Sequence, residues 1–123
     1  MSEEKRDKNE LKYRCYYFSL KIISLLDDLP RKNSAKVIAD QLMRSATSIG
    51  ANMVEARASS SRLEYKKFFE ISLKSANETK YWLGLLRDAK LSNEQKTNEL
   101  LTEVEELANM IASGVIKLKS KLK

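Results

Sequence analysis

The sequence predicts an all-α fold, an antiparallel up-down-up-down four-helix bundle in a single domain that spans residues 1–123. Apolar residues recur at helical spacing in four successive stretches, which is the pattern of amphipathic helices. Glycine occurs only three times and proline once, whereas the turns between strands need such residues. Because the connections between the stretches are short, successive helices are expected to lie side by side and antiparallel.

The first helix is expected over about residues 8–28. Asp7 and Glu10 have the spacing of a capping box, in which an acceptor at the N-cap is followed by a carboxylate three residues later. Pro30 ends the helix because it disfavours the α conformation at the residue before it. The face expected to lie in the core consists of Leu11, Cys15, Phe18, Ile22, Leu25, Leu26 and Leu29.

The other side of this helix carries a second apolar strip. A helix that is apolar on two sides is either deeply buried or faces a partner, and a domain of this size cannot bury both sides of an outer helix. We therefore interpret this outer strip as an interface between subunits. The alternative is that its tyrosines are half-exposed, with their hydroxyl groups in water. The outer strip consists of Tyr13, Tyr16, Leu20 and Ile23.

The second helix is expected over about residues 34–57. Gly50 lies near its middle and costs about 1 kcal/mol relative to alanine, which indicates close contact with a neighbouring helix or a bend. Small residues beside the apolar face would let another backbone approach closely. The predicted core residues are Ile38, Leu42, Ala46, Ile49, Met53 and Ala56.

The third helix is expected over about residues 61–89. Ser61 followed by Glu64 is a capping box, a fairly specific signal for a helix start. At about 1.5 Å per residue this helix is roughly 40 Å long, which is normal for a bundle. Its inner face is expected to comprise Tyr65, Phe68, Ser72, Ser75, Thr79, Trp82, Leu83 and Leu86.

The fourth helix is expected over about residues 92–121, with Ser92 and Gln95 as its capping box. Acidic residues favour its N-terminal half and lysines its C-terminal end, which is the order that the helix dipole favours. These lysines could also contact nucleic acid, although the dipole explains them more simply. The lysines are Lys117, Lys119, Lys121 and Lys123, and the core stripe is Leu100, Val104, Leu107, Ile111, Val115, Leu118 and Leu122.

The net charge of +6 is confined to the middle of the sequence. Residues 31–90 contain twelve basic and six acidic residues, whereas residues 1–30 (six and six) and residues 91–123 (five and five) are balanced. A localised basic excess can attract phosphate groups. The candidate nucleic-acid contacts are Arg44, Arg57, Arg62, Lys66, Lys67, Lys80 and Arg87.

Part of this basic set repeats every seven residues along the third helix. The repeat predicts one outward-facing stripe in which basic residues alternate with apolar ones, a pattern that could track a phosphate backbone. An ordinary solvated helix face would show the same spacing. The stripe comprises Lys66, Leu73, Lys80 and Arg87, with Arg62 and Phe69 beside it.

The residue types that are missing exclude several kinds of chemistry. Without histidine the protein cannot use a histidine base or build the usual zinc sites. Cys15 is the single cysteine, so no intrachain disulfide can form, and its place on an inner face fits a small hydrophobic residue. We predict no catalytic residue, no metal site and no cofactor, because no phosphate-binding loop, nucleophile elbow or ligand cluster is present.

The sequence also predicts where the protein acts. It contains no run of eighteen apolar residues, so no segment is expected to span a membrane. Residues 1–12 are charged and lack the apolar region of a signal peptide. We therefore expect a cytoplasmic protein.

Three polar residues, Asn52, Glu55 and Glu78, stand out because a helical core does not need them. Asn52 and Glu55 lie one turn apart, and Glu78 is expected at the edge of the inner face of its helix. We interpret the group as structural, with Arg44 or a neighbouring subunit as the partner of Glu78. Two carboxylates can also act as acid and base or hold a metal, but no other residue supports that alternative.

One part of the sequence resembles a known family. It reads QLMRSATSIGANMVEA and continues as RLEYKKFFEISLKSANE. It resembles the 23S rRNA intervening-sequence protein family, also called the four-helix-bundle protein family. The pattern of that family is close to Q-L-R-R-A-A-x-S-I-x-x-N-I-A-E-G and then E-F-x-x-F-L-x-I-A-x-G-S-x-x-E. The matching residues hold their register across a turn and are Gln41, Leu42, Arg44, Ala46, Ser48, Ile49, Asn52, Glu55, Glu64, Phe68, Ile71, Ser75 and Glu78.

Four positions depart from the family pattern. Met43 replaces a usual arginine, Gly50 a frequent proline, and Ala56 and Lys74 two usual glycines. The missing glycine at position 56 allows the second helix to run a turn further. The missing arginine at position 43 weakens the case for a basic patch at that place.

The resemblance implies a bacterial four-helix bundle that assembles as a homopentamer. The sequence is also similar to the accessory proteins of diversity-generating retroelements, which are basic pentameric barrels that bind nucleic acid and a reverse transcriptase. No catalytic residues come with the family. Our first hypothesis is therefore a non-enzymatic, oligomeric protein that binds RNA or DNA. The alternative is an oligomeric adaptor that presents a groove to another protein and has no affinity for nucleic acid.

Overall fold

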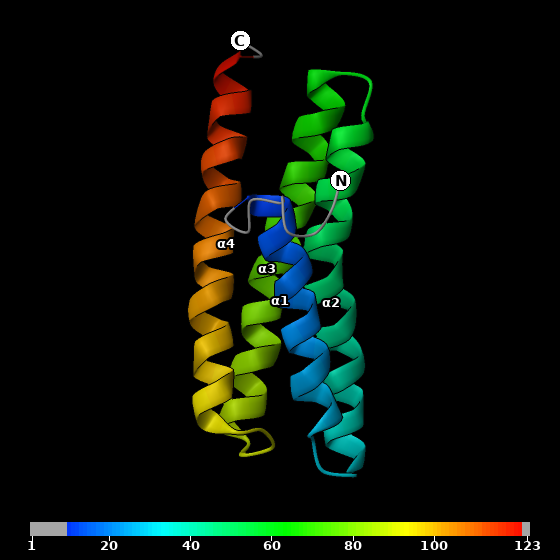
Figure 1. Cartoon of the computed structure of the whole chain (residues 1–123), viewed down its shortest axis with the longest axis vertical. Coiled ribbons are helices and arrows are strands. Elements are labelled where there is room, and N and C mark those ends of the chain that lie inside the picture. Colours follow the sequence, from blue (N-terminus) through cyan, green and yellow to red (C-terminus); the bar gives the residue numbers. More distant parts are fainter. Residues whose placement is uncertain (1–9, 122–123) are drawn as a thin grey trace.

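The structure is a computed structural model that describes residues 10–121, with side chains described as far as residue 119. Its helices are α1 (Leu11–Asp27), α2 (Asn33–Ala58), α3 (Arg62–Asp88) and α4 (Glu94–Lys121). Successive helices run in opposite directions, and α4 packs back against α1 (Figure 1). Among the described residues, the backbones of helices on opposite corners, α1 with α3 and α2 with α4, do not approach one another closely. The predicted up-down-up-down bundle is therefore confirmed.

A single apolar core runs between the four helices. The predicted core residues of the first, second and fourth helices that are described all lie in or against the core, with Leu11, Leu26, Leu29, Ile38 and Leu118 only partly buried. Ala35 of α2 and Ala108 of α4 are also buried, although the periodicity did not predict them. The predicted core residue Leu122 lies outside the described residues. The largest fully buried side chains include Phe18, Ile22, Leu42, Ile49, Leu83, Leu86, Leu107 and Ile111.

The inner face of α3 differs in part from the prediction. Phe69 was expected beside an outward stripe, but it is buried and stacks on Tyr65, with 5.0 Å between ring centroids. Leu73, expected within that stripe, packs against the core. Seven-residue spacing fixes which residues share a direction along the helix, but not where that direction points. The positions of α2 and α4 around α3 decide which neighbour the stripe faces, and in the structure it faces α4.

Two of the three predicted capping boxes need correction. α1 begins at Leu11 with Glu10 as its N-cap, and the Glu10 side chain makes no capping hydrogen bond; Asp7 lies outside the described residues. α4 is capped by Asn93, whose Oδ1 accepts from the Lys96 amide at 2.9 Å. The cap is Asn93 rather than the predicted Ser92, because Asn93 lies three residues before Lys96 and its side chain therefore reaches the Lys96 amide.

The start of α3 matches the prediction, since the Ser61 hydroxyl accepts from the Glu64 amide at 3.1 Å. The predicted cap residue of α4, Ser92, instead pairs its hydroxyl with that of Thr97 at 2.7 Å. α2 ends at Ala58, one residue beyond the predicted end. Within residues 10–121, no helix has the length and apolar character needed to cross a membrane.

The seam between α2 and α3 is lined by small hydroxyl residues. Ser72 donates to the carbonyl of Ile49 at 2.9 Å, and Thr79 lies 3.0 Å from the Ser45 hydroxyl. Ser45, Ser72 and Thr79 are all buried, so these bonds satisfy polar groups that would otherwise be costly to bury. Small side chains also let the two backbones come close together.

α1 approaches α2 closely at one glycine. A Cβ atom added at Gly50 would lie 3.3 Å from the Cβ of Cys15. The sequence left a close contact or a bend as the reason for this glycine, and the structure supports the close contact.

The two ends of the bundle are unlike because α1 is short. It has 17 residues, against 26 to 28 in the other helices, so it is about 15 Å shorter at 1.5 Å per residue. All four helices reach the closed end, which holds the α1–α2 and α3–α4 turns (Figure 1). Only α2, α3 and α4 reach the open end, which holds the α2–α3 turn and the last turn of α4 (Figure 1).

Candidate nucleic-acid interface

Four of the seven predicted nucleic-acid contacts have partners within the chain. Lys66 pairs with Glu70 at 3.1 Å, one turn along α3. Lys80 of α3 pairs with Glu105 of α4 at 2.6 Å. Because an opposite charge lies beside each of these lysines, they attract phosphate less than their number suggests.

Arg87 and Arg44 are held in the same way. Arg87 pairs with Asp88 at 3.0 Å and donates to Asn98 of α4 at 2.9 Å. Arg44 pairs with Glu78. Since Lys80 and Arg87 both reach α4, the predicted outward stripe on α3 is wrong. It follows the border between α3 and α4.

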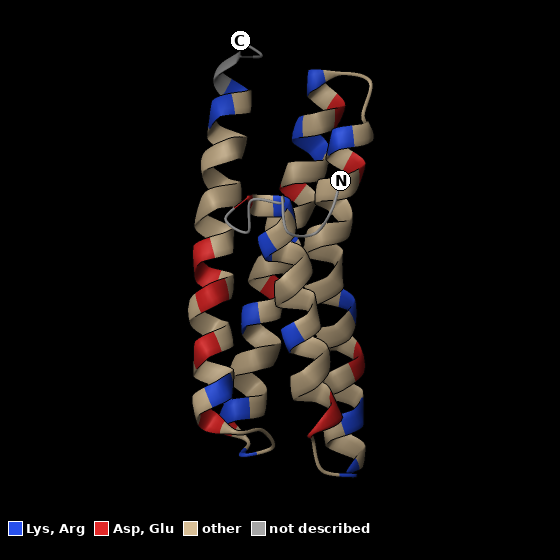
Figure 2. Cartoon of the chain, viewed as in Figure 1, with Lys and Arg blue, Asp and Glu red and all other residues tan. Residues whose placement is uncertain are grey.

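The remaining predicted contacts, Arg57, Arg62 and Lys67, are exposed and lie at the open end, on both sides of the α2–α3 turn. Within residues 10–119 no carboxylate forms an ion pair with any of them. The exposed lysines of the last turns of α4, Lys117 and Lys119, reach the same end of the bundle (Figure 2). We call these five residues the open-end basic cluster.

The acidic residues are placed differently. Three exposed carboxylates, Glu10, Glu55 and Glu64, lie near the open-end basic cluster and are fewer than its five basic residues. Further along α4, Figure 2 shows several acidic positions at heights where the neighbouring helices carry basic ones. Glu103 pairs with Lys21 at 2.9 Å and Glu106 with Arg14 at 3.0 Å. Exposed basic residues without an ion pair among the described residues also occur at the closed end, including Arg31, Lys32 and Lys36, so the open end is distinguished by its excess of positive over negative charge.

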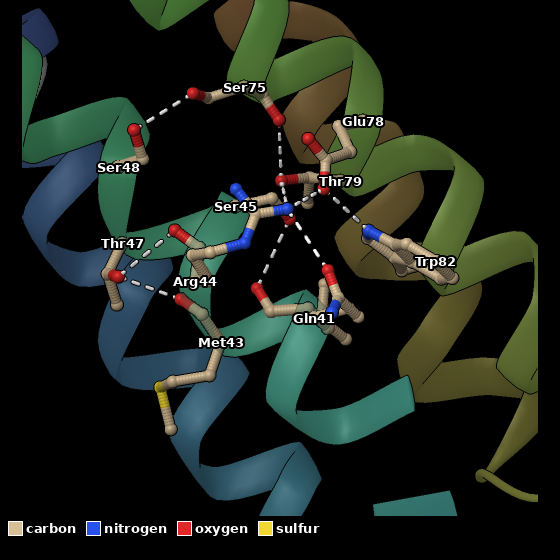
Figure 3. A network of polar contacts seen from close by, with 11 residues as sticks. Gln41, Met43, Arg44, Ser45, Thr47, Ser48, Ser75, Glu78, Thr79 and Trp82 are labelled. Atoms are coloured by element: carbon tan, nitrogen blue, oxygen red, sulfur yellow. Dashed lines mark hydrogen bonds and ion pairs between the residues drawn. The ribbon is translucent and has the colours of Figure 1, made fainter. Parts of the chain in front are cut away.

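Two polar residues of the family motif, Arg44 of α2 and Glu78 of α3, meet across the α2–α3 seam (Figure 3). Glu78 binds Arg44 and accepts from the indole nitrogen of Trp82 at 2.9 Å. Arg44 also donates to Gln41 at 3.1 Å. The predicted pairing of Glu78 with Arg44 is therefore present, and it ties α2 to α3.

Asn52 and Glu55 do not join Glu78 in one site. Asn52 donates to the carbonyl and the hydroxyl of Ser48 at 2.8 and 2.9 Å, and Ser48 receives a hydrogen bond from Ser75 at 2.9 Å. Glu55 is exposed on α2. Among the described residues there is no group of three potential metal ligands. The Ser48–Ser75 hydrogen bond and the Arg44–Glu78 ion pair tie α2 to α3.

The outer strip of α1 is exposed in large part. Tyr16 is 58% exposed, Leu20 47% and Ile23 38%, while Tyr13 is half-buried. A shallow hollow between α1 and α2 continues this apolar surface towards Val54. Its other lining residues are Lys12, Tyr13, Tyr16, Ser19, Thr47, Gly50 and Ala51.

The sequence could not reveal two features of the open end. The open-end basic cluster combines residues of three helices, and the lysines of α4 join it only because α4 ends beside the α2–α3 turn. The aromatic pair of Tyr65 and Phe69 lies at the same end, whereas the seven-residue repeat placed Phe69 outside the core. The capping signal at Ser61 located the turn correctly, and it was the one sequence feature that pointed to this end.

Comparison with known proteins gives the family. The model of the 23S rRNA-intervening sequence protein family matches residues 7–113. The chain belongs to this family. A search of curated proteins gives no match.

A solved structure of the same kind supports the fold. It is the crystal structure of a protein of unknown function from the S23 ribosomal protein family of Bacteroides thetaiotaomicron. This chain is similar to it with 31% identity and a TM-score of 0.81. The match covers 86% of this chain and 98% of that one, so the likeness extends over the whole bundle rather than one hairpin.

Proposed function

We propose that this 23S rRNA-intervening sequence protein is a non-catalytic, homo-oligomeric protein of the cytoplasm that binds RNA or DNA through the open-end basic cluster. One observation carries the proposal. Five exposed basic side chains from three helices lie at one end, where they outnumber the carboxylates and form no ion pairs among the described residues, while in the middle of the bundle Lys21, Arg44 and Lys80 pair with carboxylates.

Phosphate binding requires positive charge that is free to be neutralised by the ligand. Each phosphate contacted releases condensed counterions, so binding weakens as salt rises, by about 0.7 in the logarithmic slope per contact on a single strand. A lysine or arginine that already has a carboxylate neighbour gains less from a phosphate. Arg57, Arg62 and Lys67 meet the requirement best.

The outer strip supports the oligomeric part of the proposal. Its side chains form a continuous apolar surface on α1, which a second copy would cover. The family resemblance implies five copies. Five open ends in one assembly would multiply the basic surface and raise avidity for a long nucleic acid.

The test of binding uses a fluorescently labelled single-stranded RNA and measures its anisotropy at several salt concentrations. We expect the affinity to fall steeply between 50 and 200 mM salt. Replacing Arg57, Arg62 and Lys67 together by glutamine should weaken binding at least about tenfold and reduce the magnitude of the salt slope by about two.

The matched control removes the same charge from the closed end, by changing Arg31, Lys32 and Lys36 to glutamine; all three are exposed there. We expect a much smaller loss. Equal losses in the two triple variants would show that net charge alone matters and would exclude the open end as the interface. No binding by the wild type at low salt would exclude the function itself.

Light scattering tests the assembly separately. Wild-type protein should form a homo-oligomer, and Tyr16→Asp with Ile23→Asp should yield monomers of unchanged helix content. A monomeric wild type would exclude this use of the outer strip. A stable oligomer without affinity for nucleic acid would favour the adaptor instead.

A further inference from the structure

A hollow at the open end lies where α1 stops short of its neighbours. It encloses about 220 Å³ and is bordered by the start of α1, the last turns of α2 and the first turns of α3. Its lining residues are Glu10, Leu11, Lys12, Met53, Arg57, Tyr65 and Phe69. The hollow therefore combines an apolar floor with charged side chains.

The floor holds a fixed pair of aromatic rings. Tyr65 and Phe69 stack with 5.0 Å between centroids and an angle of 25° between their planes. Phe69 is 9% exposed and lies against Gly114 of α4, where an added Cβ would come within 2.5 Å of its ring. Because Phe69 is held in this way, the half-buried ring of Tyr65 rests on a firm support.

The rim of the hollow is mainly basic. Arg57 belongs to the open-end basic cluster and is exposed, and Lys12 lies with its Nζ 4.7 Å from the centroid of the Tyr13 ring. Glu10 is the one carboxylate among the lining residues. An aromatic surface flanked by cations matches the two faces of a nucleotide, a flat base and a charged phosphate.

We propose that this hollow receives an unpaired base of a single-stranded nucleic acid, which stacks on Tyr65 while Arg57 contacts an adjacent phosphate. The inference rests on the proposed function and adds the class of ligand. Bases in a duplex are stacked on their neighbours and cannot enter the hollow, whereas unpaired bases can be splayed out onto aromatic side chains. Stacking needs no particular base, so sequence preference should be weak.

The experiment compares three labelled probes of equal length: a uridine 12-mer, an abasic 12-mer with the same backbone, and a 12-base-pair duplex. Wild-type protein should bind the uridine strand about tenfold more tightly than the abasic strand and more tightly than the duplex. The abasic strand retains every phosphate, so this difference reports the bases alone.

Three variants assign the effect to the hollow. Tyr65→Leu keeps an apolar side chain without a ring and should lower affinity for the uridine strand about tenfold, leaving the abasic strand unaffected. Tyr65→Phe should bind like wild type. Tyr81→Leu makes the same change at a tyrosine of α3 that is 63% exposed outside the hollow, and it should have no effect.

The outcomes separate the two proposals. If none of the three probes binds at low salt, the proposed function fails. If both single strands bind equally to wild-type protein, or if the duplex binds more tightly, the basic end contacts phosphates only and the inference about the hollow is wrong. Equal affinities of Tyr65→Leu and Tyr81→Leu for the uridine strand would also overturn it. The comparison of probes on wild-type protein holds even if Tyr65→Leu folds poorly.

Discussion

The closed end of this bundle is built from four helices and the open end from three, and the two ends differ in packing and in charge. Towards the closed end four helices surround the core, and ion pairs such as Lys21 with Glu103 and Lys80 with Glu105 link neighbouring helices. At the open end α1 stops short and a hollow lies beside its first turn, and the five residues of the open-end basic cluster have no carboxylate partners among the described residues. Under the proposed function, one short helix is enough to separate a tightly packed section from a surface available for binding.

The largest expected effect compares one substitution at the two ends. Leu86 is fully buried near the closed end, so Leu86→Ala should cost about 2–5 kcal/mol. Leu118 is only partly buried near the open end, so Leu118→Ala should cost about 1 kcal/mol or less. Urea denaturation measures the free energy of unfolding of both variants, and the two can be compared when their m-values agree. Equal costs would mean that the open end is as well packed as the closed one.

The second prediction concerns Cys15, which is fully buried near the start of α1. Burial, helped slightly by Glu103 and opposed by Arg14, raises the pKa of the Cys15 thiol from 9.0 to about 12. The folded state therefore keeps its proton between pH 9 and 12 while the unfolded state loses it, so stability should fall with rising pH in this range, by up to about 1.4 kcal/mol per pH unit. Below pH 9 the thiol should have no effect on the pH dependence.

The measurement is the unfolding free energy of wild type and Cys15→Ala at pH 7, 9 and 10.5. Tyrosines and lysines titrate in both proteins, so the difference between them isolates the thiol. If the difference stays constant across this range, water reaches Cys15 and the buried core begins further from the start of α1 than the structure indicates.

The smallest expected effects come from two helical glycines. An added Cβ at Gly84 of α3 meets no atom within 4 Å, so Gly84→Ala should stabilise the protein by about 0.5–1 kcal/mol through helix propensity. At Gly114 the same atom would come within 2.5 Å of the Phe69 ring. Gly114→Ala should therefore be at least about 1 kcal/mol less stable than Gly84→Ala.

Thermal unfolding of the two glycine variants checks this prediction. If Gly114→Ala is as stable as Gly84→Ala, the Phe69 ring moves freely into the hollow, and the aromatic support proposed for Tyr65 is not firm.

The sequence was informative where local chemistry decides the structure. Apolar periodicity gave the four helices and most of their core faces, and Ser61 located the start of α3. The pairing of Glu78 with Arg44 followed from their places at the edges of two helices. Each of these depends on neighbouring residues or on one helix pair.

The rest depended on distances that a sequence does not contain. The direction of the Lys66–Arg87 stripe was wrong because α4, with Glu105 and Asn98, approaches α3 from that side. The open-end basic cluster and the hollow require three or four helices to end at particular heights. The residue at which α1 begins sets one of these positions, and the predicted capping box of Asp7 and Glu10 did not locate it.

The hydroxyl seam of α2 and α3 also has a consequence for folding kinetics. Its hydrogen bonds join residues 23 to 34 positions apart, whereas the bonds from α1 to α4 join residues 82 to 96 apart. Closing the shorter loops loses less chain entropy, so we expect this hairpin to form first and α1 to dock on α4 last. In kinetic measurements Thr79→Val should slow refolding, while Arg14→Ala should mainly speed unfolding.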